Sequence, residues 1–282
     1  MGMDEYMLAC IRALAENRIQ DAKNNAIICC INDTTKKNEG KTKYYKKLLP
    51  NLKGLIHMQD VSDFREDRYY LGCQQKELFE QIEKCVRTTT KMLEYGIPYM
   101  NSTLIYGVPG TGKTEFARYT AYKLGLPYAY LNFSYLIESY MGKTAQNLQR
   151  VFDYCKGQKC VLMLDEIDCI GLERGNDTGC DGELARTTIA LMQALDGLVD
   201  GQIVIAATNR SDRLDKALLR RFQRQVEFNP YGPFERRYMA EKYINSVDPK
   251  FMTEEIKSFV EDEHTQAEIV KYLIAKIVEK IS

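Results

Sequence analysis

The sequence predicts an α/β fold in which a parallel sheet carries helices on both faces. Short apolar runs at 102–106, 128–133, 161–164 and 203–207 contain no Asp, Glu, Lys or Arg, as is typical of strands that are buried on both faces. Segments with a helical pattern separate these runs, and such an alternation favours parallel strands. We also expect a small helical lid at the C-terminal end and a helical segment at the N-terminal end.

The composition narrows the class of protein. The 282 residues contain 39 Lys+Arg and 39 Asp+Glu, so the formal net charge is +0. This balance argues against a general nucleic-acid coat or a polybasic membrane binder, although it leaves room for a local basic channel. No apolar run approaches the roughly 20 residues that span a bilayer, and no signal-peptide core is evident, so we expect a cytoplasmic protein without a membrane span. The nine cysteines form no C-x-x-C pair and are expected to be buried apolar residues in a reducing cytosol.

A glycine-rich stretch directly follows the run at 102–106. Residues 107–114 read Gly-Val-Pro-Gly-Thr-Gly-Lys-Thr and match the phosphate-binding loop (P-loop) pattern G-x-x-x-x-G-K-T, between a predicted strand and a predicted helix. Main-chain N–H groups and the helix N-terminus would face the phosphates, Lys113 would reach the β- and γ-phosphates, and the Thr114 hydroxyl would hold Mg²⁺. The predicted nucleotide-binding residues here are Pro109, Gly110, Thr111, Gly112, Lys113, Thr114 and Glu115.

Two further polar groups stand where predicted strands end. Asp165 and Glu166 directly follow the run at 161–164. Asp165 is expected to bind Mg²⁺ through water and Glu166 to polarise the attacking water; the alternative is a solvated start of a loop. Asn209 lies just beyond the run at 203–207, at the edge where open α/β sheets bind ligands, and can hydrogen-bond the lytic water or the γ-phosphate.

The two ends of the chain have a helical pattern. Residues 3–31 carry an apolar stripe, and the lysine-rich stretch 32–47 is expected to be a solvated segment, with a nucleic-acid-binding arm as the alternative. Near the other end, 253–255 and 265–268 are typical helix starts, the second a capping box. The predicted organisation is an N-terminal helical or linker segment at 1–67, a large α/β domain at 68–232 and a small helical lid at 233–282.

One segment of the sequence resembles a known protein family over many consecutive residues. Residues 206–222, Ala-Ala-Thr-Asn-Arg-Ser-Asp-Arg-Leu-Asp-Lys-Ala-Leu-Leu-Arg-Arg-Phe, resemble the region from sensor 1 to the arginine fingers of AAA ATPases of the AAA+ superfamily. The resemblance covers roughly 68–282. It implies Mg²⁺-dependent hydrolysis of ATP to ADP and phosphate by a ring, six subunits being the family's expectation. It also implies that Arg220 and Arg221 reach the nucleotide of the neighbouring subunit, and that Gly72 contributes to the adenine pocket.

A further resemblance concerns the substrate. Residues 136–143 resemble the first pore loop of that family, in which Tyr140, Met141 and Gly142 would project into a central channel and grip an extended polypeptide; an ordinary turn is the alternative. Residues 171–182 correspond to the second pore loop. The segment 265–269 departs from the family pattern, because many relatives carry Gly-Ala there and no arginine stands at the second sensor position. How the lid responds to nucleotide therefore stays open.

Three functions fit these residues. The first is a protein remodeller, an unfoldase or disassembly chaperone that threads polypeptide through the pore of a homo-oligomeric ring. The second is a nucleic-acid motor or helicase loader, for which a basic pore stripe or a DNA-binding module is expected and neither is evident. The third is an assembly clamp that binds ATP without turnover, although Glu166, Asn209 and both candidate fingers are present. The chain contains no H-E-x-x-H zinc-protease motif.

Overall fold

The structure is a computed structural model that describes residues 55–139, 143–156, 159–170 and 181–281. Within these ranges six strands form one sheet in the order β1-β3-β4-β5-β2-β6. The strands are β1 (His57–Gln59), β2 (Ser102–Tyr106), β3 (Tyr128–Asn132), β4 (Cys160–Asp165), β5 (Gln202–Thr208) and β6 (Arg224–Glu227). All neighbouring pairs are parallel except β1 and β3, which are antiparallel.

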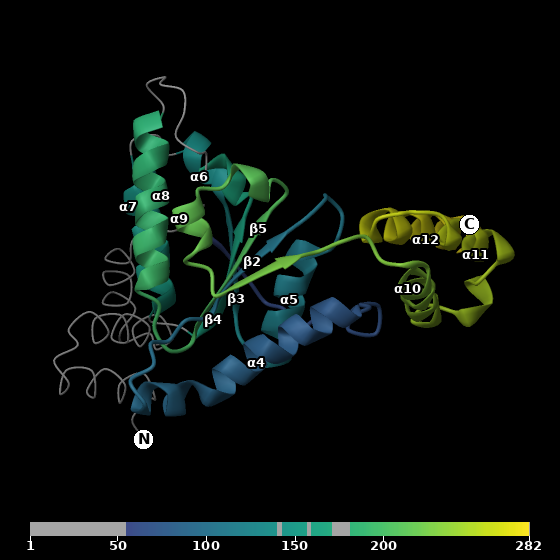
Figure 1. Cartoon of the computed structure of the whole chain (residues 1–282). Coiled ribbons are helices and arrows are strands. Elements are labelled where there is room, and N and C mark those ends of the chain that lie inside the picture. Colours follow the sequence, from purple (N-terminus) through teal and green to yellow (C-terminus); the bar gives the residue numbers. More distant parts are fainter. Residues whose placement is uncertain (1–54, 140–142, 157–158, 171–180, 282) are drawn as a thin grey trace, which may run out of the picture.

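Helices cover both faces of this sheet (Figure 1). The helices are α4 (Cys73–Glu94), α5 (Lys113–Leu124), α6 (Phe133–Ser139), α7 (Thr144–Lys156), α8 (Asp181–Asp196), α9 (Lys216–Leu219), α10 (Pro233–Asn245), α11 (Glu254–Glu261) and α12 (Gln266–Ile281). Short 3₁₀ turns lie at Ile167–Cys169, Ser211–Arg213 and Pro249–Phe251. Helices α4 and α5 pack on one face, and α7 and α8 on the other. The predicted α/β fold, a parallel sheet between helices, is confirmed.

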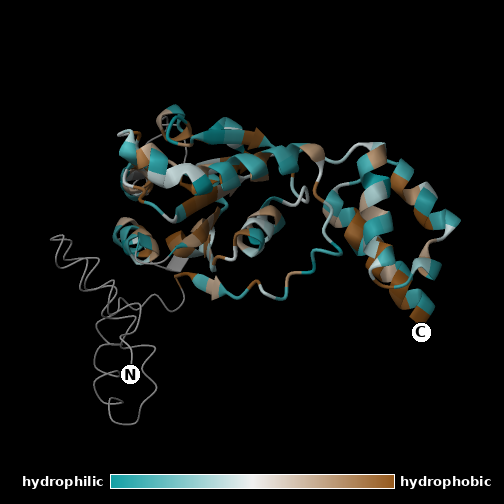
Figure 2. Ribbon diagram, turned by 90° about the horizontal axis from the view of Figure 1, so that it is seen from below, coloured by the Kyte–Doolittle hydropathy of each residue, from teal (hydrophilic) through white to brown (hydrophobic). Residues whose placement is uncertain are grey.

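Consecutive strand residues point to opposite faces and enter different cores. Leu104 packs with the residues under α7 and α8, whereas its neighbour Ile105 packs with those under α4 and α5. Leu162 and Met163 divide between the two faces in the same way. Both faces are therefore apolar, and the hydrophobic colour gathers in the strands between the helices (Figure 2). This explains why these runs lack charged residues.

Helices α10, α11 and α12 form a separate small bundle after the end of β6 (Figure 1). Its core contains Met239, Ile256, Ile269 and Leu273, all buried. The guanidinium of Arg236, only 4% exposed, donates hydrogen bonds to the carbonyls of Val260, Tyr231 and Glu261 at 2.8, 2.8 and 2.6 Å. This arginine ties α10 to the C-terminal end of α11, where main-chain carbonyls lack partners within the helix.

Two strands lie outside the sequence-based expectation. The sheet has an antiparallel edge at β1, whose three residues are all exposed, and a further parallel edge at β6, whose residues alternate between half-buried and exposed. Neither segment carries the continuous apolar run that marks the central strands. The helical segment expected at 3–31 lies outside the described residues. Of the helices that the structure describes, none is both long and apolar enough to cross a membrane.

Candidate nucleotide site

The glycine-rich stretch forms the turn between β2 and α5. Lys113, the first residue of α5, is only 8% exposed. Its Nζ donates hydrogen bonds to the carbonyls of Gly107 and Val108 at 2.8 and 2.9 Å. Burial lowers the pKa of Lys113, and the nearby Asp165 opposes this shift. The ammonium is thus held by two neutral carbonyl acceptors. Negatively charged phosphate oxygens form stronger hydrogen bonds with an ammonium and would compete with these carbonyls for it.

Two glycines allow the loop to approach the segment just beyond β6 and the start of α12 closely. At Gly107, with φ +137°, a Cβ would lie 2.2 Å from the Phe228 carbonyl oxygen just beyond β6. At Gly110, with φ +84°, a Cβ would lie 2.9 Å from Thr265 Oγ1. The Gly110 carbonyl also accepts a hydrogen bond from the Ala267 N–H of α12 at 3.0 Å. The loop therefore contacts both the start of the lid and the strand that leads to it.

Oxygen ligands meet beside the start of α5. Thr114 Oγ1 lies 3.0 Å from Asp165 Oδ2 at the end of β4, and the hydroxyl of Tyr130 donates to the same carboxylate oxygen at 3.2 Å. A hydroxyl and a carboxylate at the phosphate end of a loop form the hard oxygen set that Mg²⁺ prefers. The two residues predicted to hold the metal are therefore adjacent. Tyr130, which points to Asp165 from β3, was not predicted from the sequence.

The residue after β4 is held in an unusual conformation. Glu166 has φ 58°, the only positive φ of a non-glycine residue in the described ranges. Its N–H donates to Asp165 Oδ1 at 3.0 Å, and its Oε2 accepts a hydrogen bond from Asn132 Nδ2 at 3.0 Å. Backbone strain of this kind collects at functional positions. Asn132 is paired with Asp165 in the sheet register, so the polar residue near the end of the run at 128–133 was the signal that sequence reasoning missed.

Asn209 directly follows β5 and is exposed at the same edge. The preceding Thr208 is buried, and its hydroxyl donates to Asp168 Oδ1 at 2.8 Å and accepts from the Arg210 N–H at 2.9 Å. These bonds fix the backbone on both sides of Asn209. Asn209, Asp165 and Glu166 all line one cavity with the phosphate loop.

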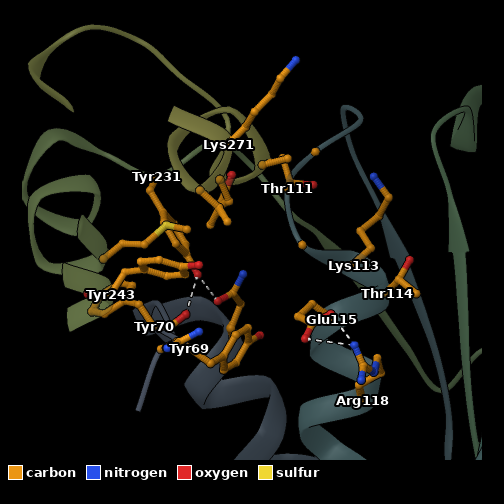
Figure 3. A pocket seen from close by; sticks show the side chains of 18 of the residues that line it. Tyr69, Tyr70, Thr111, Lys113, Thr114, Glu115, Arg118, Tyr231, Tyr243 and Lys271 are labelled. Carbon is orange, nitrogen blue, oxygen red and sulfur yellow. Dashed lines mark hydrogen bonds and ion pairs between the residues drawn. The ribbon is translucent and has the colours of Figure 1, made fainter. Parts of the chain in front are cut away.

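That cavity has a volume of about 960 Å³ and lies between the phosphate loop, α12 and the segment before α4. Figure 3 shows tyrosines on one side of it and the polar side chains of α5 on the other. The labelled tyrosines are Tyr69, Tyr70, Tyr231 and Tyr243. Gly72, predicted at the adenine pocket, does not line the cavity. It packs against the ring of Tyr231, which does line it, and a Cβ at Gly72 would lie 2.7 Å from that ring. Its neighbours Tyr70 and Gln75 form the wall instead.

A protein-family model described as "ATPase family associated with various cellular activities (AAA)" matches residues 103–230. Residues 103–230 are an AAA domain. The match includes the phosphate loop, the acidic pair after β4 and Asn209, which the structure places around one cavity. The resemblance seen in the sequence is thereby confirmed.

Relatives of the AAA domain are longer proteins. The 26S proteasome regulatory subunit 10B homolog A of Arabidopsis thaliana is 39% identical over 163 residues, which are 56% of this chain and 41% of that protein. The ATP-dependent zinc metalloprotease FtsH 2 of Symbiobacterium thermophilum is 38% identical over 161 residues, 55% of this chain and 27% of that protein. The uncharacterized AAA family ATPase y4kL of Sinorhizobium fredii is 32% identical over 194 residues, 67% of this chain and 58% of that protein. The chain thus spans less than two thirds of each of these relatives.

The two arginines near the end of the AAA domain differ in their contacts. Arg221 Nε donates to Asp196 Oδ2 at 3.1 Å, and its Nη1 donates to the Ala217 carbonyl at 2.7 Å. Arg220 is exposed, and its guanidinium has no partner within the described part of the chain. Neither residue lines the cavity beside the phosphate loop. Arg220 is therefore the one whose charge is available to another molecule.

The lid enters the site through the start of α12. Thr265 and Glu268 form the predicted capping box: the Thr265 N–H donates to Glu268 Oε2 at 2.8 Å, and the Glu268 N–H donates to Thr265 Oγ1 at 3.4 Å. This cap holds the first turn of α12 against the phosphate loop. Tyr140, Met141 and Gly142, predicted as a pore loop, lie outside the described residues, as do 171–180.

Proposed function

We propose that this protein hydrolyses ATP with Mg²⁺ and uses the energy to remodel polypeptides as a homo-oligomeric ring. One observation carries the hydrolytic part: Asp165 Oδ2 lies 3.0 Å from Thr114 Oγ1 at the phosphate loop, and Glu166 follows it in a strained conformation. The proposal thus rests on metal ligands and a candidate base that converge at the phosphate end of one cavity.

Each residue has a separate role in this proposal. Main-chain N–H groups of residues 109–114 and the Lys113 ammonium bind the phosphates. Thr114 and Asp165 would hold Mg²⁺, which when bound neutralises negative charge on the phosphates. Glu166 orients and polarises the attacking water, and Asn209 hydrogen-bonds that water or the γ-phosphate.

Asn132 supports the role of Glu166. Its amide holds one carboxylate oxygen at 3.0 Å, which leaves the other oxygen to accept a proton from water. Because the Asn132 side chain also caps α6 by accepting from the Tyr135 N–H at 3.0 Å, its own position is fixed. The carboxylate is thereby oriented before substrate arrives.

Assembly into a ring is supported by the free guanidinium of Arg220. A cation that does not reach the nucleotide of its own subunit can still stabilise transition-state charge in a neighbour, and a finger of this kind is worth about 10³–10⁵ in rate. Identical contacts repeated around an axis close into a ring. Six subunits is the expectation from the family.

Polypeptide as the substrate is supported by the relatives. One is named as a regulatory subunit of a proteasome and another as an ATP-dependent metalloprotease, so both names connect the matched domain with proteolysis. In this chain Tyr140 would contact the substrate, since an aromatic side chain offers a large apolar face and loses few rotamers on contact. The same residue type could stack on a base, which makes single-stranded DNA the necessary comparison.

The test measures ATP hydrolysis by the full chain alone, with an unfolded protein, and with single-stranded DNA. We expect stimulation by the unfolded protein and ATP-dependent unfolding of a folded client. Tyr140→Ala should abolish unfolding and spare the basal ATPase. Tyr135→Ala, which removes an exposed tyrosine of α6, is the matched control. If Tyr140→Ala unfolds clients normally and loses salt-sensitive binding to single-stranded DNA, a nucleic-acid motor replaces the remodeller.

A further inference from the structure

A hydrogen bond joins two residues that lie outside the lining of the nucleotide cavity. Asp168 belongs to the 3₁₀ turn that follows Glu166. Thr208 is the last residue of β5, directly before Asn209. The Thr208 hydroxyl donates to Asp168 Oδ1 at 2.8 Å. Glu166 and Asn209 line the cavity, so this bond joins the two segments that carry the residues proposed to act on water.

The direction of the bond determines what else the Thr208 hydroxyl can do. An ionised carboxylate has no hydrogen to give, so the single hydrogen of the hydroxyl points to Asp168 and its lone pairs are left to accept. The Arg210 N–H donates to this oxygen at 2.9 Å. The result is a chain of two bonds that ends on a negative charge, and hydrogen bonds to an ionised acceptor are the strong ones. Thr208 is only 1% exposed, so the chain is shielded from competing water.

One end of this chain of bonds fixes the turn that carries Asn209. Thr208 and Arg210 flank Asn209, and the hydroxyl of the first binds the N–H of the second. The Arg210 guanidinium in turn makes two hydrogen bonds with Asp212, each at 3.1 Å, and so holds the residues beyond. The Asn209 side chain has no hydrogen-bond partner among the described residues. Its position therefore depends on the backbone that these bonds hold.

The other end of the chain of bonds is part of the turn that closes on Glu166. The Glu166 carbonyl accepts hydrogen bonds from the Cys169 N–H at 3.3 Å and from Cys169 Sγ at 2.9 Å. Ile167, between Glu166 and Asp168, is fully buried and anchors the turn in the core. Asp168 thus has a fixed place relative to Glu166, and through Thr208 it passes that place on to Asn209.

We propose that Asp168 and Thr208 are positioning residues for ATP hydrolysis that hold Asn209 at a fixed spacing from Glu166, an inference that rests on the proposed function. In that function Glu166 polarises the attacking water, and Asn209 hydrogen-bonds the same water or the γ-phosphate, so the spacing of the two side chains matters for the rate. Asp168 and Thr208 do not line the cavity. Their loss should therefore lower kcat and leave the binding of ATP almost unchanged.

The experiment measures kcat and KM for ATP with the full chain at saturating Mg²⁺. Thr208→Val keeps the shape of the side chain and removes the hydroxyl, so kcat should fall about 10- to 100-fold while KM changes by less than about twofold. Thr208→Ser keeps the hydroxyl and should retain most of the parental kcat. Asp168→Ala should resemble Thr208→Val. Asp212→Ala is the matched control, because it removes an acidic side chain from the next turn whose partner is the exposed Arg210 guanidinium, and it should keep the parental kcat.

A double-mutant cycle separates positioning from general support of the fold. If Thr208 acts through Asn209, Thr208→Val should cost little further kcat in a protein that already carries Asn209→Ala. Losses that multiply in the double variant would overturn the proposal, as would a parental kcat in Thr208→Val or a loss that Thr208→Ser does not rescue. If Thr208→Val fails to fold by circular dichroism, Asp168→Ala, at a half-buried position, decides by the same cycle. Absence of Mg²⁺-dependent hydrolysis by the parent protein would instead contradict the proposed function itself.

Discussion

Asn132 Nδ2 donates a hydrogen bond to Glu166 Oε2 across 3.0 Å and so ties the end of β3 to the residue that follows β4. Glu166 has φ 58°, a conformation that costs free energy for a residue with a side chain. The parallel register brings the two residues together, because Asn132 is paired with Asp165. We infer that the direction of the candidate catalytic carboxylate is set by its neighbour on β3.

Asn132→Ser should lower kcat about tenfold and leave the KM for ATP close to its parental value, since about 1.4 kcal/mol of barrier is a tenfold change in rate. Serine can still cap α6 by accepting from the Tyr135 N–H, but it is too short to reach Glu166. Steady-state kinetics with saturating Mg²⁺ check this. A kcat equal to or above the parental value would show that the hydrogen bond does not hold Glu166 in its working position.

Tyr130→Phe should raise the Mg²⁺ concentration needed for half-maximal ATPase activity by about three- to tenfold. The Tyr130 hydroxyl donates to Asp165 Oδ2 at 3.2 Å, and outer-sphere partners of this kind orient a metal ligand. Tyr128→Phe is the matched control, because it deletes a hydroxyl from the same strand that has no hydrogen-bond partner in the described residues. An identical Mg²⁺ titration for Tyr130→Phe and the parent would contradict the assignment.

Arg220→Ala should lower the ATPase rate without changing the stability of the fold, whereas Arg221→Ala should lower that stability. Arg220→Ala should reduce turnover by about 10³-fold with no change in melting temperature, because its guanidinium has no partner within the described part of the subunit. Arg221→Ala removes an ion pair with Asp196 and a bond to the Ala217 carbonyl, and should destabilise the fold by about 1 kcal/mol. Thermal melting and ATPase rates over a range of protein concentrations measure both effects. A parental rate from Arg220→Ala, or a rate per subunit independent of concentration, would contradict action on a neighbour.

Arg236→Met should destabilise the lid by about 3 kcal/mol. The substitution removes the hydrogen-bond donor for the carbonyls of Tyr231, Val260 and Glu261. Buried acceptors without a partner lower the stability of the folded state. Arg237→Ala is the control, because about half of each side chain in its ion pair with Glu261 is exposed to solvent, and its loss should leave the melting temperature nearly unchanged. Hydrogen exchange of α10–α12 reports the effect locally. Equal protection in Arg236→Met and the parent would disprove this role.

The sequence predicts the central strands and the phosphate loop well because both have strong local patterns. Strands buried on both faces appear as continuous apolar runs, and the loop needs a fixed glycine spacing. The edge strands β1 and β6 were not expected, since three or four partly exposed residues have no pattern of their own. Their pairing depends on the neighbouring strand rather than on their own sequence.

The parts of the site that the sequence did not show arise from contacts between distant segments. Strand register brings Asn132 to Glu166, and Gln75 lines the cavity with its amide oxygen held by Gly72 and Tyr231. The predicted roles of Arg220, Arg221 and Tyr140 concern a second subunit or a substrate, and these assignments stay predictions.

Hydrolysis and binding of ATP by the parent protein, Glu166→Gln and Lys113→Ala, measured side by side, test the central claim most directly. The parent should hydrolyse ATP only with Mg²⁺. Glu166→Gln should bind ATP with parental affinity and lose at least about 10²-fold in kcat, because its amide cannot accept a proton from water. Lys113→Ala should lose ATP binding itself, since Lys113 supplies the buried cation of the phosphate loop. Hydrolysis by Glu166→Gln at the parental rate would contradict the account.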